Sequence, residues 1–272
     1  MSPEPPLSAD ATELIGPGDA FADKTYIVTG AASGIGKATT ERLLQLRSTV
    51  LGVDLAYRGE DVRDDRVDGG RGLVTIGADV GDVLGQERVR DMARALGSVA
   101  GLVNCAGQFV SPCDWHDGAR WRGVMGTNLF GPVELCRMLA DDLAAMRGSI
   151  VNVASVSAYV AQPGLAPYST SKAALIALTR NLALSLGTRG VRVNSVSPGW
   201  IWTRPNQVAT NNDREAWERR VSRYSCLGRG GESLEIANVI CFLLSPLASY
   251  VDGADIAVDG GYLCLGPEGP GP

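Results

Sequence analysis

Three side chains with complementary acid–base chemistry lie close together in the stretch 153–178. Tyr168 and Lys172 are four residues apart in a helical pattern that opens near Pro167, so their side chains share one helix face. A phenol with the usual pKa of about 10 is a poor base at neutral pH, whereas a nearby ammonium group favours the phenolate. Ser155 ends the preceding apolar run, where it can hold a substrate oxygen against the phenol. The stretch predicts an acid–base site for an alcohol or a carbonyl compound.

The spacing of Tyr168 and Lys172 is weak evidence when taken alone. A tyrosine and a lysine one helical turn apart often have no chemical role. The chain contains only three lysines, at positions 24, 37 and 172, which makes a chance lysine at this place less expected than in a lysine-rich protein. Both interpretations stay open on this segment, and the elements around it must decide.

A glycine-rich turn near the N-terminus has the pattern of a phosphate-binding loop. Residues 25–28 are apolar or β-branched and predict a strand, and a helical pattern starts at Lys37. Glycines between a strand and a helix let backbone N–H groups approach an anion at the positive end of the helix. The predicted contacts in this turn are Gly30, Ser33, Gly34, Ile35 and Gly36.

An acidic residue follows at the distance expected for a ribose contact. Asp54 ends the next predicted strand, 18 residues after Gly36. A carboxylate accepts hydrogen bonds from ribose hydroxyls and repels a 2′-phosphate, so Asp54 favours NAD over NADP. Position 33 is Ser rather than a basic residue, which points the same way, while Arg58 keeps the NADP alternative open.

The remaining pattern alternates strands with helices and predicts a single-domain α/β fold. Further strands are expected at 73–76, 99–103, 150–154, 191–196 and 255–258, giving a doubly wound parallel sheet of about seven strands with helices on both faces. Asp79 and Val80 follow one of these strands and are candidates for contacts at the adenine edge. We expect a domain over 23–263 with a substrate lid at about 203–228, and flexible segments at 1–22 and 264–272.

Composition and charge exclude several classes of function. A net charge of −5 and no long basic run argue against nucleic acid or an anionic membrane as a partner. No 18-residue apolar stretch or secretory signal is present, and the six cysteines form no CxxC pair, so we expect a cytoplasmic protein with reduced thiols. His116 is the only histidine, and no metal site is predicted.

Polar and aromatic residues near the predicted strand ends complete the candidate site. Asn128 lies in a long helical region, where its amide is either a satisfied core group or part of a water relay, and the residue alone favours the core. Four aromatic residues could line a substrate pocket, although aromatic side chains at strand ends also serve ordinary packing. They are Phe109, Tyr159, Trp200 and Trp202.

Taken together, the motifs resemble those of the short-chain dehydrogenase/reductase family over roughly residues 22–262. The segments that carry the resemblance are TGxxxGxG at 29–36, NxAG at 104–107, YxxxK at 168–172, PG at 198–199 and DGG at 259–261, with Asn128 and Ser155 in the same order and spacing. The chain departs from the family at Cys105, where a second Asn is frequent, a position that contributes mainly backbone. The N-terminal extension is also longer than the fold needs.

The resemblance implies a catalytic tetrad and a nicotinamide cofactor. Tyr168 would transfer the hydroxyl proton, Lys172 would bind the nicotinamide ribose and lower the tyrosine pKa, Ser155 would orient the substrate oxygen, and Asn128 would hold a relay water. The implied cofactor contacts also include Asn104, Ala106, Gly107, Pro198, Ile201 and Thr203. Apolar helices at 119–147 and 166–187 would pair across a two-fold axis in a homodimer or homotetramer.

Three functions remain in competition at this point. The first is an NAD-dependent dehydrogenase for a small or medium apolar secondary alcohol, possibly cyclic. The second is a ketoreductase of lipid or natural-product biosynthesis that uses the same residues in the reducing direction. The third is a non-catalytic dinucleotide-sensing protein, against which the intact tetrad argues, since a sensor has no need of Tyr168 and Lys172.

Overall fold

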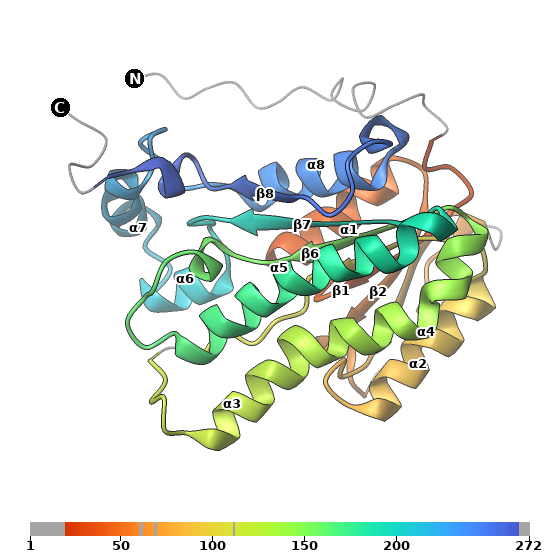
Figure 1. The fold of residues 1–272 in the computed structure, drawn as a ribbon, viewed down its shortest axis with the longest axis horizontal. Coiled ribbons are helices and arrows are strands. Elements are labelled where there is room, and N and C mark those ends of the chain that lie inside the picture. Colours follow the sequence, from red (N-terminus) through yellow and green to blue (C-terminus); the bar gives the residue numbers. More distant parts are fainter. Residues whose placement is uncertain (1–19, 60–61, 68–69, 111, 267–272) are drawn as a thin grey trace.

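A mostly parallel sheet forms the centre of the molecule (Figure 1). The computed structural model describes residues 20–59, 62–67, 70–110 and 112–266, and the described residues form one sheet in the order β3-β4-β2-β1-β5-β6-β7-β8. Only the β3–β4 pair is antiparallel. The strands are β1 (Thr25–Thr29), β2 (Thr49–Asp54), β3 (Arg63–Asp64), β4 (Gly72–Gly77), β5 (Val99–Asn104), β6 (Ser149–Val153), β7 (Arg192–Pro198) and β8 (Asp255–Val258).

Helices cover both faces of this sheet. Helices α1 and α8 pack on one face and α2, α4 and α5 on the other (Figure 1), while α6 and α7 lie together beyond the carboxyl ends of the central strands. The helices are α1 (Gly34–Gln45), α2 (Val83–Leu96), α3 (Gly118–Met125), α4 (Gly131–Ala145), α5 (Ala166–Leu186), α6 (Arg204–Ala209), α7 (Arg214–Val221) and α8 (Ser233–Leu244).

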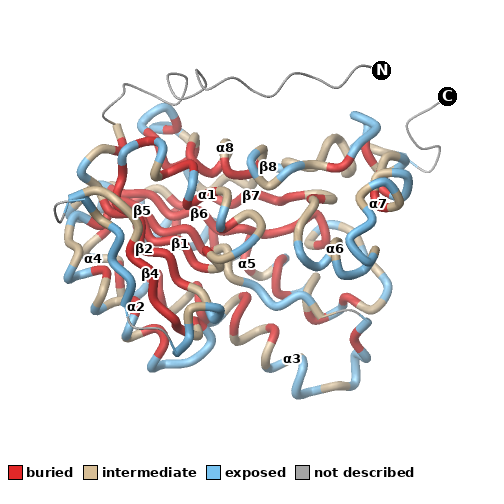
Figure 2. The backbone as a smooth tube through the Cα atoms, turned by 180° about the vertical axis from the view of Figure 1, so that it is seen from behind, coloured by how far each residue is buried: buried red, intermediate tan, exposed pale blue. Residues whose placement is uncertain are grey.

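Strand residues fill two apolar layers, one on each side of the sheet. Because successive side chains of a strand point to opposite faces, Ile27 packs beneath α2 and α4 while Val28 packs beneath α1 and α8. Both are fully buried, and the central strands are buried along their lengths (Figure 2). Each such aliphatic side chain contributes about 1.5–3 kcal/mol relative to exposure. The double burial explains the continuous apolar runs seen in the sequence.

The structure confirms the predicted doubly wound α/β fold and corrects details at its edges. The sheet has an additional strand, because the two exposed residues of β3 pair with β4 in a stretch where no strand was predicted. Phe21, placed in the flexible extension, is buried and packs on Tyr26 with ring centroids 5.3 Å apart, so it belongs to the packed domain. The rest of that extension, at 1–19, and the tail from 267 onward lie outside the described residues.

Candidate active site

The carboxyl ends of the parallel strands open into a cavity of about 430 Å³. The ends of β1, β2, β5, β6 and β7 all lie at this edge of the sheet, which is where open α/β sheets bind ligands. The cavity reaches from the glycine turn to Tyr168. Most of the predicted site residues line it: Gly30, Ser33, Gly34, Ile35, Asp54, Asp79, Val80, Ala106, Gly107, Phe109, Ser155, Tyr168, Lys172, Pro198, Trp200, Ile201 and Thr203.

The glycine turn forms a cradle that side chains would fill. Gly30 and Gly34 have φ angles of 72° and 53°, in the left-handed region that favours glycine. A Cβ on Gly36 would lie 2.1 Å from the carbonyl oxygen of Gly30, so Gly36 is required for close packing and does not itself line the cavity. Ser33, at the N-cap of α1, makes no side-chain cap, which leaves N–H groups of the first turn available to an anion.

Asp54 lies at the end of β2 with its carboxylate held by backbone groups. Its two oxygens accept hydrogen bonds from the N–H groups of Ala32 (3.0 Å) and Ala56 (2.9 Å). Arg58, the residue that kept NADP in question, instead donates to Asp79 at 3.2 Å and lies 3.7 Å from Asp82. The guanidinium is therefore already engaged by carboxylates beside the cavity.

The three predicted acid–base residues converge at the inner end of the cavity. Ser155 and Tyr168 line the same part of the cavity, close enough for the Ser155 hydroxyl to influence the pKa of Tyr168, and Phe109 packs edge-on against the Tyr168 ring at 5.1 Å between centroids. Lys172 is almost fully buried, donates to the carbonyl oxygen of Val153 at 2.6 Å and has its Nζ 5.7 Å from the centre of the Tyr168 ring. The strand β6 and the helix α5 thus bring the two hydroxyls and the amine together.

The electrostatics of the site differ from the sequence prediction. Burial raises the pKa of Tyr168, and the neighbouring Ser155 hydroxyl opposes this change without reversing it. Burial also lowers the pKa of Lys172 to about 8 and raises the pKa of the neighbouring Cys105 to about 12. The expected lowering of the tyrosine pKa by the ammonium is therefore not seen in the chain alone, because desolvation has the larger effect.

Asn128 lies behind the cavity wall in a π-helical segment, Gly126–Phe130, between α3 and α4. The Asn128 Oδ1 accepts from the N–H of Gln108 (2.7 Å), and its Nδ2 donates to the Gln108 carbonyl (3.1 Å) and to the Ser171 hydroxyl (3.0 Å). Short π-helical segments often mark functional sites. The amide is fully satisfied, as the core interpretation expected, and its bonds fix the loop that carries Phe109.

Three other predicted contacts lie away from the cavity. The Asn104 side chain is buried in the core, where it donates to Asn152 at 2.8 Å. Tyr159 points to the β7–β8 edge, and its hydroxyl donates to Asp255 at 2.6 Å. Trp202 packs against Trp217 at 5.0 Å between ring centroids. For these three residues the predicted position at a strand or loop end is correct, but the side chain points away from the cavity.

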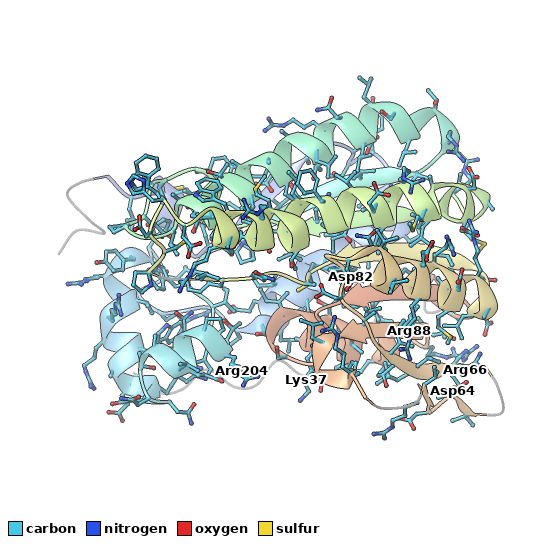
Figure 3. All side chains as sticks on the ribbon, turned by 90° about the horizontal axis from the view of Figure 1, so that it is seen from below. Lys37, Asp64, Arg66, Asp82, Arg88 and Arg204 are labelled. Carbon is cyan, nitrogen blue, oxygen red and sulfur yellow. The ribbon has the colours of Figure 1, made fainter. Side chains whose placement is uncertain are left out.

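The sequence reasoning missed several polar residues of the cavity wall. Gln108, Gln162, Arg204 and Asn206 all line the cavity. Arg204 at the start of α6 and Lys37 of α1 also line a second, shallower cavity beside the glycine turn (Figure 3). No motif distinguishes these residues. The one available signal is position, since Gln162 lies between Ser155 and Tyr168.

Neither a candidate metal site nor a membrane-spanning helix is found among the residues that the structure describes. No group of His, Cys, Asp or Glu residues there is arranged to hold a metal ion. None of the described helices has the length and apolar character needed to cross a membrane. The site is a cavity of about 430 Å³ with two hydroxyls and an amine at its inner end.

Comparisons with known proteins agree with this site. A family model described as Enoyl-(Acyl carrier protein) reductase matches residues 30–263. The chain belongs to the short-chain dehydrogenase/reductase family, and it is accordingly an oxidoreductase of the class that acts on CH–OH groups.

Individual relatives span nearly the whole chain. A cis-4-hydroxycyclohexanecarboxylate dehydrogenase from Sinomonas cyclohexanicum is 38% identical and covers 91% of this chain and 100% of its own length. A 3-oxoacyl-[acyl-carrier-protein] reductase from Thermotoga maritima is 35% identical over 88% and 98%. The crystal structure of a putative NAD(P)-dependent gluconate 5-dehydrogenase from Beutenbergia cavernae, with bound NADP, has a TM-score of 0.81 at 33% identity and covers 92% and 100%.

Proposed function

We propose that this protein is an NAD-dependent dehydrogenase that converts a secondary alcohol to a ketone, with Tyr168 as the acid–base group. The observation that carries the proposal is that Ser155, Tyr168 and Lys172 lie together in the same cavity as the glycine turn. Two hydroxyls at the far end of a cavity that begins at the glycine turn have the chemistry needed to bind a substrate oxygen and exchange its proton.

The residues present fit a nicotinamide dinucleotide. The cradle of Gly30 and Gly34 and the uncapped start of α1 suit a diphosphate, and Asp54 suits ribose hydroxyls. When bound, such a cofactor would supply the hydride acceptor. The Asp54 carboxylate disfavours a 2′-phosphate, and the pairing of Arg58 with Asp79 reduces the positive charge available to one. These features support NAD over NADP.

The protein's own groups divide the proton chemistry among them. Ser155 donates a hydrogen bond to the substrate oxygen and keeps it against the Tyr168 Oη, which accepts the hydroxyl proton during oxidation and returns it during reduction. Lys172, held by the Val153 carbonyl, places positive charge near the phenol while it is protonated. Phe109 and Leu165 line the same cavity with apolar surface and limit the entry of water.

The test is NAD reduction, followed by absorbance, with a panel of secondary alcohols. We expect wild-type turnover and a loss of at least about 100-fold in kcat for Tyr168→Phe, because general acid–base catalysis contributes about 10²–10⁴-fold. Tyr250→Phe is the matched control, since that side chain is fully exposed. Equal activity of wild type and Tyr168→Phe, or no activity in either across a broad panel of alcohols and ketones, would refute the proposal.

A ketoreductase remains the second candidate. It is favoured by the similarity to the 3-oxoacyl-[acyl-carrier-protein] reductase and by the raised pKa of Tyr168, which keeps the phenol in its proton-donating form. Comparing kcat/KM for matched alcohol and ketone pairs in both directions separates the two. A protein that binds NADH with neither activity would instead be the dinucleotide sensor.

We also propose that the protein assembles through helices α4 and α5. Phe130, next to α4, and Leu184 on α5 are 57% and 81% exposed, which is unusual for large apolar side chains on adjacent helices. Light scattering coupled to size exclusion tests this proposal, and a monomer at all concentrations would refute it.

A further inference from the structure

Gln162 shares the cavity wall with the candidate acid–base residues. It lies in the loop between the short helical turn Val156–Ala158 and α5, and it lines the cavity together with Ser155, Leu165 and Tyr168. The same turn carries Ser157, whose N–H donates to the Ser155 hydroxyl oxygen at 3.1 Å. The backbone of this turn therefore orients Ser155 and also positions the side chain that is hydrogen-bonded to Ser157.

The amide of Gln162 is fixed by that serine. The buried Ser157 hydroxyl donates to Gln162 Oε1 at 2.7 Å, which occupies the acceptor end of the amide. The other end, Nε2, carries two N–H donors and makes no hydrogen bond to any residue that the structure describes. It is not among the enclosed polar atoms without a partner, so it is accessible, and Gln162 lines the cavity. Gln162 therefore presents an oriented N–H donor that no residue described by the structure accepts from.

The surroundings make this donor selective. Val156 and Leu165 line the cavity beside it, and Phe109 packs on Tyr168, so apolar side chains flank this donor. The other cavity glutamine differs, because the Nε2 of Gln108 already donates to Thr127 at 3.0 Å. A polar group fixed in an apolar wall discriminates strongly between ligands that satisfy it and ligands that do not.

We propose that Gln162 determines substrate specificity by donating a hydrogen bond to a second oxygen of the substrate. The substrate class is then a secondary alcohol that carries a further hydroxyl, carbonyl or carboxylate group, rather than a simple hydrocarbon alcohol. The inference rests on the proposed dehydrogenase function and names the substrate of that same site. Diols, hydroxyketones and hydroxy acids share the required acceptor oxygen.

The test compares alcohols that differ only in the second oxygen. The probes are cyclohexanol, the cyclohexanediols and the hydroxycyclohexanecarboxylates, each assayed for kcat/KM with wild type, Gln162→Leu, Gln162→Glu and the control Gln45→Leu, whose side chain is exposed at the end of α1. We expect wild type to prefer at least one oxygenated probe over cyclohexanol by about 10-fold, and by up to about 100-fold for a carboxylate, which makes the stronger hydrogen bond. Gln162→Leu should bring this ratio close to one, and Gln45→Leu should leave it unchanged.

The Gln162→Glu variant shows whether the second oxygen of the substrate belongs to a hydroxyl group or to a carboxylate. A glutamate can still accept the Ser157 hydrogen bond, but it presents an acceptor and a negative charge in place of the donor. The variant should still oxidise diols, whose second hydroxyl can donate a hydrogen bond to the glutamate. Its kcat/KM for hydroxy acids should fall by at least a further 10-fold, because the two carboxylates repel each other. A hydroxy-acid substrate predicts this rejection, and a diol substrate predicts tolerance.

Two results would overturn the inference. If Tyr168-dependent oxidation is found but Gln162→Leu keeps the wild-type preference ratio, or if wild type prefers no oxygenated probe, the role of Gln162 is wrong and the dehydrogenase proposal survives. If no alcohol or ketone is turned over by wild type, both proposals fail together. Thermal melting of each variant confirms that a lost preference does not reflect unfolding.

Discussion

Replacing Lys172 by methionine should make the protein more stable at neutral pH while impairing the site. Lys172 is 4% exposed, and no carboxylate among the described residues lies within 4.0 Å of its amine. Burial lowers its pKa from 10.5 to about 8, and each tenfold change in proton affinity is worth about 1.4 kcal/mol. Keeping the amine protonated in the fold therefore costs about 3 kcal/mol at pH 7.

The net gain is smaller because the lysine also makes one good contact. Its amine donates to the Val153 carbonyl at 2.6 Å, and losing that hydrogen bond removes about 1 kcal/mol. Methionine retains most of the apolar stem, so Lys172→Met should be more stable than wild type by about 2 kcal/mol at pH 7. In a chain of this size, that difference corresponds to an increase of about 4–8 °C in Tm.

The pH dependence identifies the cause. The cost of the buried ammonium is fully present below pH 8 and disappears as pH rises from about 8 to 10.5, where the unfolded lysine also loses its proton. The stability advantage of Lys172→Met should therefore shrink over this range and change sign near its upper end, where only the lost hydrogen bond remains.

Urea unfolding of both proteins at pH 7 to 10.5, without dinucleotide and at equal protein concentration, measures this difference. Lys37→Met is the control, because that lysine is 60% exposed and pairs with Glu41 at 3.6 Å, so it should change stability by less than about 0.5 kcal/mol at every pH. A Lys172→Met variant that is less stable at pH 7, or whose difference from wild type does not vary with pH, would refute the reasoning.

Three further changes probe the residues around the site. Tyr159→Phe should lower the free energy of unfolding by about 1 kcal/mol at pH 8 in urea titrations, because the half-exposed Tyr159–Asp255 hydrogen bond is lost. Burial is the larger cause and the hydrogen bond to Asp255 the second cause that raise the pKa of Tyr159 to about 12. The stability difference between wild type and Tyr159→Phe should therefore fade between pH 10 and 12, and a difference that stays constant over this range would contradict the prediction. Arg214→Met should loosen α7, because the guanidinium donates to Glu232 at 2.6 Å and lies 5.1 Å from two tryptophan rings. Faster hydrogen exchange over 204–224 and a higher KM are expected, whereas unchanged exchange would count against a lid. Asp54→Asn should raise the kcat/KM ratio of NADP to NAD by about 10-fold, and an unaltered ratio would remove Asp54 from cofactor selection.

The sequence was sufficient for the parts of the fold that follow local periodicity. The strand predicted at 25–28 lies within β1, and the one predicted at 255–258 coincides with β8. β3 was missed because its two residues are exposed and carry no alternation of apolar and polar side chains. Only pairing with the edge of β4 makes them a strand.

Side-chain direction at the site depended on partners distant in the chain. Tyr159 follows a predicted strand end as closely as the cavity residues do, but Asp255, which is 96 positions away, draws its hydroxyl toward the β7–β8 edge. Trp202 similarly packs against Trp217 and Arg214 of α7. Asn128 was placed correctly in a helical region, yet a period of 3.6 residues cannot reveal the π-helical turn that aims its amide at Gln108.

The pKa of Tyr168 shows where reasoning from spacing must fail. The four-residue separation correctly placed Lys172 on the same face, but it contained no information about how far either group is removed from water. Burial drives both groups toward their neutral forms, because removal from water disfavours the lysine ammonium and the tyrosine phenolate alike. A neutral phenol beside the Ser155 hydroxyl can donate a proton, which suits ketone reduction. Oxidation through the same residue requires additional positive charge near the phenol oxygen, beyond what the chain itself provides.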